Sequence, residues 1–266
     1  MDKCRAIGLF DSGVGGLTVS RQVFSQLPDE STIYYGDTAH VPYGPRSPEE
    51  LVGFADTIIS FLMEQGVKYV IFACNTSSSL SLHLVREKHK VPMIGLINPG
   101  AAEAVRQTQN GRVGIIATEA TVRSNAYRSA IEHLSPGVKV FSQAAPRLVP
   151  LVEAGLSGTA AAREAVQEYL KPLQRENIDT LILGCTHYPF MEEEIRTVLG
   201  SSVTLVDPAV ATVRAAREDM ERRGLLSGEG DCRVEHNYYV SGDPARFQQE
   251  AKRFLGHPLE QVRKVR

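Results

Sequence analysis

Two stretches of this chain share one arrangement: Val70-Ile71-Phe72-Ala73-Cys74-Asn75-Thr76 and Leu181-Ile182-Leu183-Gly184-Cys185-Thr186-His187. In each, a short apolar run is followed by a small residue, a cysteine and hydroxyl, amide or imidazole neighbours. Such a run between polar residues is typical of a buried strand. Ligands of open α/β sheets bind just beyond the carboxyl ends of the strands. The repeat therefore predicts two thiols presented alike, which suits a reaction that needs one base on each face of a carbon.

Further apolar runs alternate with helix-like stretches along the chain. We expect strands at residues 6–10, 32–35, 69–73, 93–96, 113–117, 138–141, 180–183 and 203–206. This alternation predicts βαβ units, and so an α/β fold of mostly parallel sheets flanked by helices. Ser47-Pro48-Glu49-Glu50 has the pattern of a capping box. Asp243-Pro244 predicts a second helix start, where the dipole favours the carboxylate.

The repeated strand and cysteine also predict two similar α/β lobes. We expect the first lobe to comprise residues 1–97 plus 208–266 and to carry Asp11 and Cys74. The second lobe, residues 98–207, would carry Cys185 and His187. A turn at Asn98-Pro99-Gly100 would be the first crossing between the lobes, and a second crossing near Asp207-Pro208 would return the chain to the first lobe.

Length and charge restrict the class of protein. The 266 residues allow one large or two smaller domains. Lys+Arg 29 against Asp+Glu 31 gives a net charge of -2, which favours neither a nucleic acid nor an anionic membrane as partner. No apolar stretch approaches the roughly 20 residues of a membrane helix, and the start at Met1-Asp2-Lys3-Cys4-Arg5 lacks a secretory signal. We therefore expect a cytoplasmic protein.

The 4 cysteines include no C-x-x-C pair. This count and spacing argue against a disulfide framework, a zinc ribbon or a thioredoxin-type redox pair. We expect free thiols in a reducing compartment, with Cys4 and Cys232 chemically inert.

Two polar loops follow predicted strands. In Asp11-Ser12-Gly13-Val14-Gly15-Gly16, glycine amides ahead of a helix are suited to bind an anion. The loop lacks both the G-x-G-x-x-G pattern and the P-loop lysine, which disfavours a nucleotide site, and a simple helix cap is the alternative. The second loop, residues 36–44, gathers hydrogen-bonding groups where a doubly wound sheet binds its ligand. Alternatively, Pro42-Tyr43-Gly44 is a turn with a packed tyrosine.

The cysteines themselves also allow more than one interpretation. A buried free cysteine is usually a small hydrophobic side chain, but a nearby helix start favours the reactive thiolate. Metal binding by Cys185, His187 and Cys74 lacks the spacing of a zinc site. His187 is better interpreted as an acid or base beside Cys185, although a lone histidine is often structural.

Taken together, these segments resemble glutamate racemases of the cofactor-independent aspartate/glutamate racemase superfamily. The matching motifs run in the family's order from Asp11 to Asp207: D-S-G-V-G-G at 11–16, Y-G-D-T-A-H-V-P-Y-G at 35–44, A-C-N-T at 73–76, P-G-A at 99–101, V-P-L-V-E at 149–153 and G-C-T-H-Y-P at 184–189.

The resemblance implies two pseudosymmetric lobes with the active site in the cleft between them, without pyridoxal phosphate or metal. It implies interconversion of L-glutamate and D-glutamate, a supply of D-glutamate for peptidoglycan, and a homodimer. Cys74 corresponds to the thiol acting on the D-isomer and Cys185 to the thiol acting on the L-isomer. Asp11 and His187 are similar to their auxiliary groups, and Glu153 to a further acidic residue near the site. Substrate-binding positions are matched by Asp11, Ser12, Tyr43, Gly44, Asn75, Thr76, Thr118, Thr186 and His187.

The chain departs from the family pattern at Ala144-Ala145-Pro146 and at Ser77-Ser78-Ser79, away from the expected catalytic positions. Three other functions stay open. A cysteine hydrolase or decarboxylase would need only one essential thiol, and a binding module for a small acid would need none. Aspartate racemisation is the nearest alternative, and the G-C-T-H-Y-P and P-Y-G motifs favour glutamate.

Overall fold

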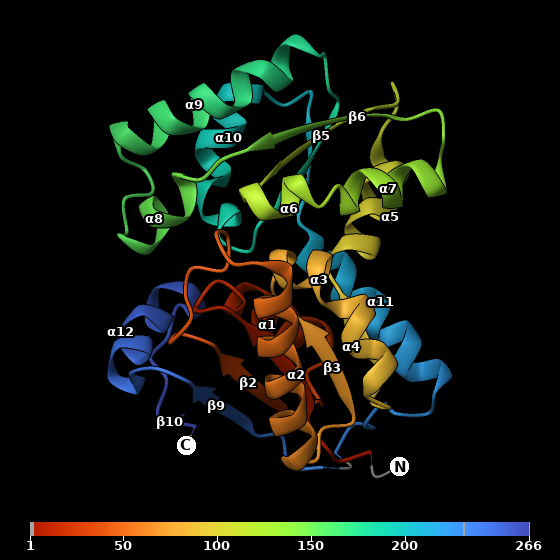
Figure 1. Cartoon of the computed structure of the whole chain (residues 1–266), viewed down its shortest axis with the longest axis vertical. Helices are drawn as coiled ribbons and strands as arrows, with labels where there is room; N and C mark the ends of the chain where they lie inside the picture. Colours follow the sequence, from red (N-terminus) through yellow and green to blue (C-terminus); the bar gives the residue numbers. More distant parts are fainter. Residues whose placement is uncertain (1–2, 231, 266) are drawn as a thin grey trace. The chain divides into compact units, whose positions relative to one another are not determined.

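The computed structural model describes residues 3–230 and 232–265, and Figure 1 colours its elements along the chain. The chain divides into two compact units, Met1–Leu96 with Thr212–Arg266, and Ile97–Ala211. Every strand pairing in the described part of the chain is parallel. The predicted α/β class with parallel sheets flanked by helices is therefore confirmed.

The first unit is built on a six-stranded sheet in the order β10-β9-β2-β1-β3-β4. Its elements are β1 (Ile7–Asp11), α1 (Leu17–Gln26), β2 (Thr32–Gly36), α2 (Pro48–Glu64), β3 (Tyr69–Phe72), α3 (Asn75–Leu80), α4 (Leu82–Lys88), β4 (Met93–Gly95), α11 (Pro208–Arg222, which begins in the other unit), β9 (His236–Val240), α12 (Pro244–Leu255) and β10 (Val262–Lys264).

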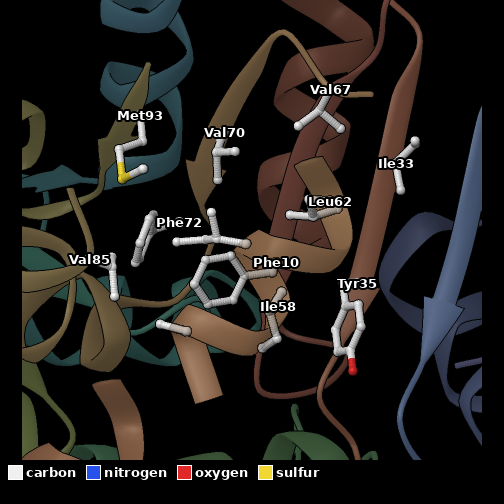
Figure 2. Close-up of a cluster of buried hydrophobic side chains, with 12 residues drawn as sticks. Phe10, Ile33, Tyr35, Ile58, Leu62, Val67, Val70, Phe72, Val85 and Met93 are labelled. Atoms are coloured by element: carbon white, nitrogen blue, oxygen red, sulfur yellow. The ribbon is translucent and has the colours of Figure 1, made fainter. Parts of the chain in front are cut away.

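Helices cover both faces of this sheet because its strands are apolar on both sides. On one face, the rings of Phe10 and Phe72 lie with centroids 4.5 Å apart and planes tilted by 60°. They pack with Ile58 of α2 and Val85 of α4 in the cluster of Figure 2. Residues pointing to the other face meet α11 and α12. Tyr69 donates a hydrogen bond to Asp219 of α11, and the Tyr34 ring lies 6.0 Å from that of Phe247 in α12.

The second unit has a four-stranded sheet in the order β6-β5-β7-β8. Its elements are α5 (Ile97–Gln107), β5 (Arg112–Ala117), α6 (Glu119–Arg123), α7 (Ala126–Leu134), β6 (Lys139–Ala144), α8 (Leu148–Glu153), α9 (Ala160–Arg175), β7 (Thr180–Gly184), the 3-10 helix η1 (Tyr188–Met191), α10 (Glu192–Leu199) and β8 (Thr204–Val206). Ile115 and Ile182 share one core with Ala101 of α5 and Ile131 of α7.

The first four strands of each unit are arranged in the same order. Numbered along the chain within its own unit, each set follows the order 2-1-3-4. In doubly wound sheets of this kind, the strand order reverses between the first and third strands, and ligands bind at that reversal, beyond the carboxyl ends. Asp11 ends β1 and Cys74 follows β3, while Thr118 and Cys185 follow β5 and β7. Each thiol therefore lies at the switch point of its own sheet.

The structure confirms the local predictions at two helix starts. Ser47 accepts from the Glu50 amide while the Glu50 side chain accepts from the Ser47 amide, completing the capping box. The Asp243 carboxylate caps α12 through the Ala245 amide. All eight expected strands are present, but β9 and β10 were not predicted.

The predicted turn at Asn98-Pro99-Gly100 is wrong, because these residues form the first turn of α5. Proline is tolerated there since the first amides of a helix have no acceptor within it. A Cβ on Gly100 would lie 3.0 Å from Pro208 Cβ, so a small residue fits this contact. Gly100 therefore allows α5 to pack closely against Pro208 and does not form a turn.

The expectation that Cys4 and Cys232 are free is also wrong, because they form a disulfide. Their Cα atoms lie 5.5 Å apart although 228 residues separate them in sequence, a proximity that spacing cannot reveal. Nearby, the fully buried Lys68 pairs with Glu30 at 2.5 Å, and both contact Ser227. Cys232 is thus joined to the chain just before β1 by a covalent bond, and Ser227 is joined to the chain just before β2 and β3 by hydrogen bonds.

Within residues 3–230 and 232–265, no helix has the length and apolar content needed to cross a membrane.

Candidate active site

Cys74 occupies the N-cap position of α3, and one residue separates it from β3. It is 6% exposed and is a free thiol. Its carbonyl accepts the amide of Ser78 at 2.9 Å, while Asn75 and Thr76 begin the helix and are buried. The thiol thus lies at the start of a helix, followed by two buried polar residues.

Asp11 organises the glycine-rich turn beside this thiol. Its carboxylate oxygen Oδ2 accepts the amides of Gly13 at 3.2 Å and Gly16 at 2.9 Å. The turn therefore binds the chain's own carboxylate. Asp11 does not cap α1 as the alternative predicted, because the N-cap of that helix is Gly16, which has no side-chain cap hydrogen bond. Ser12 is half-buried in the same turn.

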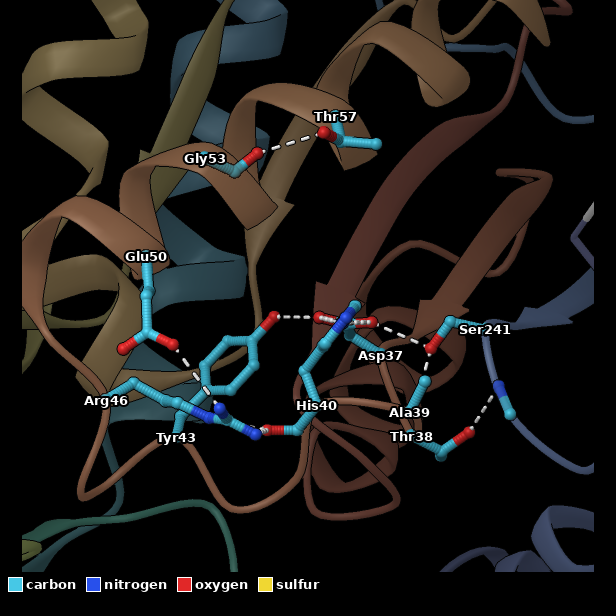
Figure 3. A network of polar contacts seen from close by, with 11 residues as sticks. Asp37, Thr38, Ala39, His40, Tyr43, Arg46, Glu50, Gly53, Thr57 and Ser241 are labelled. Carbon is cyan, nitrogen blue, oxygen red and sulfur yellow. Dashed lines mark hydrogen bonds and ion pairs between the residues drawn. The ribbon is translucent and has the colours of Figure 1, made fainter.

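The loop after β2 is organised by a second buried carboxylate (Figure 3). Asp37, 2% exposed, accepts the Tyr43 hydroxyl at 2.7 Å, the Ser241 hydroxyl at 2.7 Å and His40 Nδ1 at 2.8 Å. Burial, followed by the Asp37 charge and hydrogen bond, raises the pKa of Tyr43 far above its usual range. Tyr43 is therefore a fixed neutral donor.

Tyr43 also contacts the thiol region, since it shares a small apolar cluster with Leu51 and Cys74. The packed-tyrosine interpretation of this loop is therefore correct, and the same side chain lies at the candidate site. Gly44 follows it, half-buried, with open space where a side chain would project.

Cys185 lies in a different environment from Cys74. It follows β7 directly and is 7% exposed and free. Its sulfur lies 3.7 Å from His187 Nδ1, and His187 Nε2 lies 3.1 Å from Glu153 Oε1. Because a carboxylate only accepts, Nε2 donates to Glu153, and the neutral form of the ring would present the Nδ1 lone pair to the thiol. The geometry allows His187 to take or return the Cys185 proton.

The remaining expected positions of this unit lie near the same sheet edge. Thr118 caps α6 by accepting the Thr121 amide, and Thr186 is buried between Cys185 and His187. The structure thus groups Asp11, Ser12, Tyr43, Gly44, Cys74, Asn75 and Thr76 in the first unit, and Thr118, Glu153, Cys185, Thr186 and His187 in the second.

The sequence interpretation missed several polar residues of these groups. Asp37 lay in a quoted motif but was not singled out, while Ser241 follows the unpredicted strand β9. Tyr34 and Tyr188 are fully buried. Buried tyrosines are hard to recognise in a sequence because a hydroxyl in an apolar run does not reveal its acceptor.

A half-buried acid, Asp207, follows β8, the strand that pairs with β7. Desolvation raises the pKa of the Asp207 carboxyl, despite a hydrogen bond from the Ala209 amide. Burial, then the charges of Asp207 and Cys185, raises the pKa of Tyr127 well above its ordinary value.

In the part of the chain that the structure describes, no three His, Cys, Asp or Glu side chains cluster as metal ligands.

The chain has two doubly wound parallel sheets, and each sheet carries a thiol at its switch point. This arrangement is typical of α/β enzymes that hold acid and base groups at the ends of strands. Comparison with known proteins is consistent with this class. The profile of the Asp/Glu/Hydantoin racemase family matches residues 15–216, and the chain belongs to that family. The resemblance inferred from the motifs is thereby confirmed.

Within the family, this chain is similar to proteins named glutamate racemase. One from Desulforudis audaxviator is 58% identical over 265 residues, covering 97% of each chain. The crystal structure of a glutamate racemase isoform from Bacillus anthracis matches with a TM-score of 0.95 at 39% identity, covering 100% of this chain and 98% of that one. The Francisella tularensis glutamate racemase in complex with D-glutamate matches with a TM-score of 0.92 at 34% identity, with the same coverage.

Proposed function

We propose that this protein is a cofactor-independent amino-acid racemase that interconverts L-glutamate and D-glutamate, with Cys74 and Cys185 as the two bases. The observation that carries the proposal is the repeated placement of a free thiol at the switch point of each sheet. The names of the similar proteins support glutamate over aspartate as the substrate.

The proposed reaction moves one proton on each face of the α-carbon. With D-glutamate bound, the Cys74 thiolate removes the α-proton and becomes a thiol. The carbanionic centre then takes a proton from the Cys185 thiol on the opposite face, which yields L-glutamate and a Cys185 thiolate. The two thiols exchange roles in the reverse direction.

Each thiol would have its own assisting groups. His187, oriented by Glu153, accepts the Cys185 proton when that thiol must start as thiolate and returns it in the other direction. Asp11 would assist Cys74, since its carboxylate is held in place by two backbone amides.

The α-proton is a far weaker acid than a thiol, and each unit of pKa difference corresponds to about 1.4 kcal/mol. The site must therefore stabilise the developing charge with preorganised donors. We assign this to Ser12, Asn75, Thr76 and Thr186, with Tyr43, Gly44 and Thr118 completing the substrate site. Exclusion of water would strengthen these contacts.

The test is incubation of the purified protein with L-glutamate in deuterated water without added cofactor. NMR follows loss of the α-proton signal, and circular dichroism follows loss of optical activity. We expect both signals to decay with wild type, and Cys74→Ser and Cys185→Ser each to slow the decay at least about 100-fold. The Cys4→Ser/Cys232→Ser double variant is the matched control and should retain the wild-type rate.

Other outcomes separate the alternatives. If only one of the two thiols proves essential for activity, a hydrolase or decarboxylase is favoured. Tight binding of glutamate without exchange of its α-proton favours a binding module. Faster exchange of L-aspartate than of L-glutamate would move the assignment to aspartate.

We further propose that the enzyme acts in the cytoplasm as a homodimer and supplies D-glutamate for peptidoglycan. Rescue of a bacterial strain that requires D-glutamate tests the biological role, and light scattering tests the dimer.

A further inference from the structure

Tyr34 lies beneath the Asp11 turn and is fully buried. Its hydroxyl donates to the Gly13 carbonyl at 2.8 Å, while Asp11 accepts the Gly13 amide. The Gly13 residue is thus held from both sides, by its amide and by its carbonyl. A Cβ on Gly16 would lie 2.8 Å from the Tyr34 hydroxyl and 2.5 Å from Asp11 Cβ. The turn therefore packs so closely against Asp11 and Tyr34 that a side chain at residue 16 does not fit.

Tyr188 is a fully buried tyrosine of the other unit that also donates to a backbone carbonyl. It follows His187 directly, and its hydroxyl donates to the Ala145 carbonyl at 3.0 Å. The same carbonyl accepts the amide of Leu148 at 3.2 Å, which is the first residue of α8. The last residue of α8 is Glu153, whose carboxylate binds His187.

The second set of contacts therefore forms a closed ring. The chain bond joins His187 to Tyr188, the hydroxyl joins Tyr188 to Ala145, α8 leads to Glu153, and Glu153 binds the imidazole. Removing the hydroxyl opens this ring at the start of α8. The distance between Glu153 and His187 would then be less restricted.

Both hydroxyls keep their protons at physiological pH. Burial, followed by the charges of Asp11 and Cys74, raises the pKa of Tyr34 well above its ordinary value. Burial, followed by the charge of Cys185, raises the pKa of Tyr188 in the same way. Each tyrosine is thus a permanent donor committed to a backbone carbonyl, close enough to one thiol to be affected by its charge.

We propose that Tyr34 and Tyr188 are positioning residues, one for each thiol: Tyr34 fixes the Asp11 turn for Cys74, and Tyr188 fixes the Glu153–His187 pair for Cys185. This inference rests on the two-thiol reaction proposed above. Neither hydroxyl transfers a proton to the substrate.

Rates alone cannot assign each tyrosine to a thiol. Enantiomers have equal free energies, so kcat/KM must be equal in the two directions for every variant. Primary deuterium isotope effects do separate the two proton-transfer steps. D-[2-²H]glutamate reports removal of the α-deuteron by Cys74, and L-[2-²H]glutamate reports removal of the α-deuteron by Cys185. A slower proton removal makes that step more rate-limiting and raises the effect for its own enantiomer.

The experiment compares Tyr34→Phe and Tyr188→Phe with wild type. We expect kcat to fall about 3- to 10-fold in each, the range for loss of one hydrogen bond, with KM changed less than kcat. The isotope effect should rise only with D-[2-²H]glutamate in Tyr34→Phe and only with L-[2-²H]glutamate in Tyr188→Phe. Tyr238→Phe is the control and should match wild type, since this buried tyrosine pairs with Tyr34 across the sheet and its ring lies 6.3 Å away.

The proposal is overturned if both variants raise the isotope effect for the same enantiomer, or if kcat falls without any change in either effect. Failure of either variant to fold also overturns it, because the hydroxyl would then be required for folding itself. Failure of the proposed function looks different, since wild type would then exchange no α-proton.

Discussion

His187 Nε2 lies 3.1 Å from Oε1 of Glu153, a residue 34 positions earlier in the chain. Because this contact fixes which imidazole nitrogen carries a proton, it leaves Nδ1 to face the Cys185 sulfur at 3.7 Å. Cys74 is placed instead beside a carboxylate turn. The two thiols thus have unlike partners on similarly ordered sheets.

Glu153→Gln should lower kcat/KM about 10-fold, because the neutral amide no longer stabilises an imidazolium beside Cys185. The decrease must be equal for both enantiomers, with a larger isotope effect for L-[2-²H]glutamate. Glu168→Gln is the control, since Glu168 is an exposed acid paired with Arg147. Wild-type kcat/KM in Glu153→Gln would exclude a role for this carboxylate.

Asp37→Asn should lower the free energy of unfolding by about 2–3 kcal/mol, because one carboxylate oxygen that accepts hydrogen bonds becomes an amide nitrogen that donates. Ser241→Ala removes one donor from the same carboxylate and the acceptor of the exposed Ala39 amide, and it should have a smaller effect of about 1 kcal/mol. Urea denaturation measures both. Since Asp37 also holds Tyr43, KM should rise in Asp37→Asn, and equal stability of the two variants would contradict this network.

Removal of the disulfide in Cys4→Ser/Cys232→Ser should lower the free energy of unfolding by about 2–5 kcal/mol, because the bond closes a very long loop of the unfolded chain. The racemisation rate should not change. Dithiothreitol should lower the melting temperature of wild type to that of the variant and leave the variant unaffected. An equal effect of reductant on both proteins would show that the bond does not form.

Asp179 should make stability depend on acid pH. Partial burial raises the pKa of its carboxyl, but hydrogen bonds from Thr108 and the amides of Asn110 and Gln109 outweigh this and lower it. A lowered folded-state pKa stabilises the fold above the unfolded value of about 3.9, and that stabilisation is lost as pH falls through the folded value. Asp179→Asn should be about 1–2 kcal/mol less stable at pH 7.

The difference between Asp179→Asn and wild type should narrow below about pH 4, since protonation then removes the charge in wild type also. Denaturation curves between pH 2 and 7 would measure it. A difference that is independent of pH would mean that the Asp179 charge does not contribute.

The sequence by itself determined the α/β class, the strands β1 to β8, the helix caps at Ser47 and Asp243, and the family. These features depend on local periodicity and short motifs, which neighbouring residues specify together. It did not identify β9, whose residues are only partly buried, so its apolar signal is weak.

Only the tertiary structure decided which distant groups meet. The Cys4–Cys232 bond and the contacts of Asp37 with Ser241, of Glu153 with His187 and of Tyr188 with Ala145 join residues 34 to 228 positions apart. The physical reason is that such pairs are set by how strands are ordered in a sheet, and a hydrogen-bond donor carries no local sign of its acceptor.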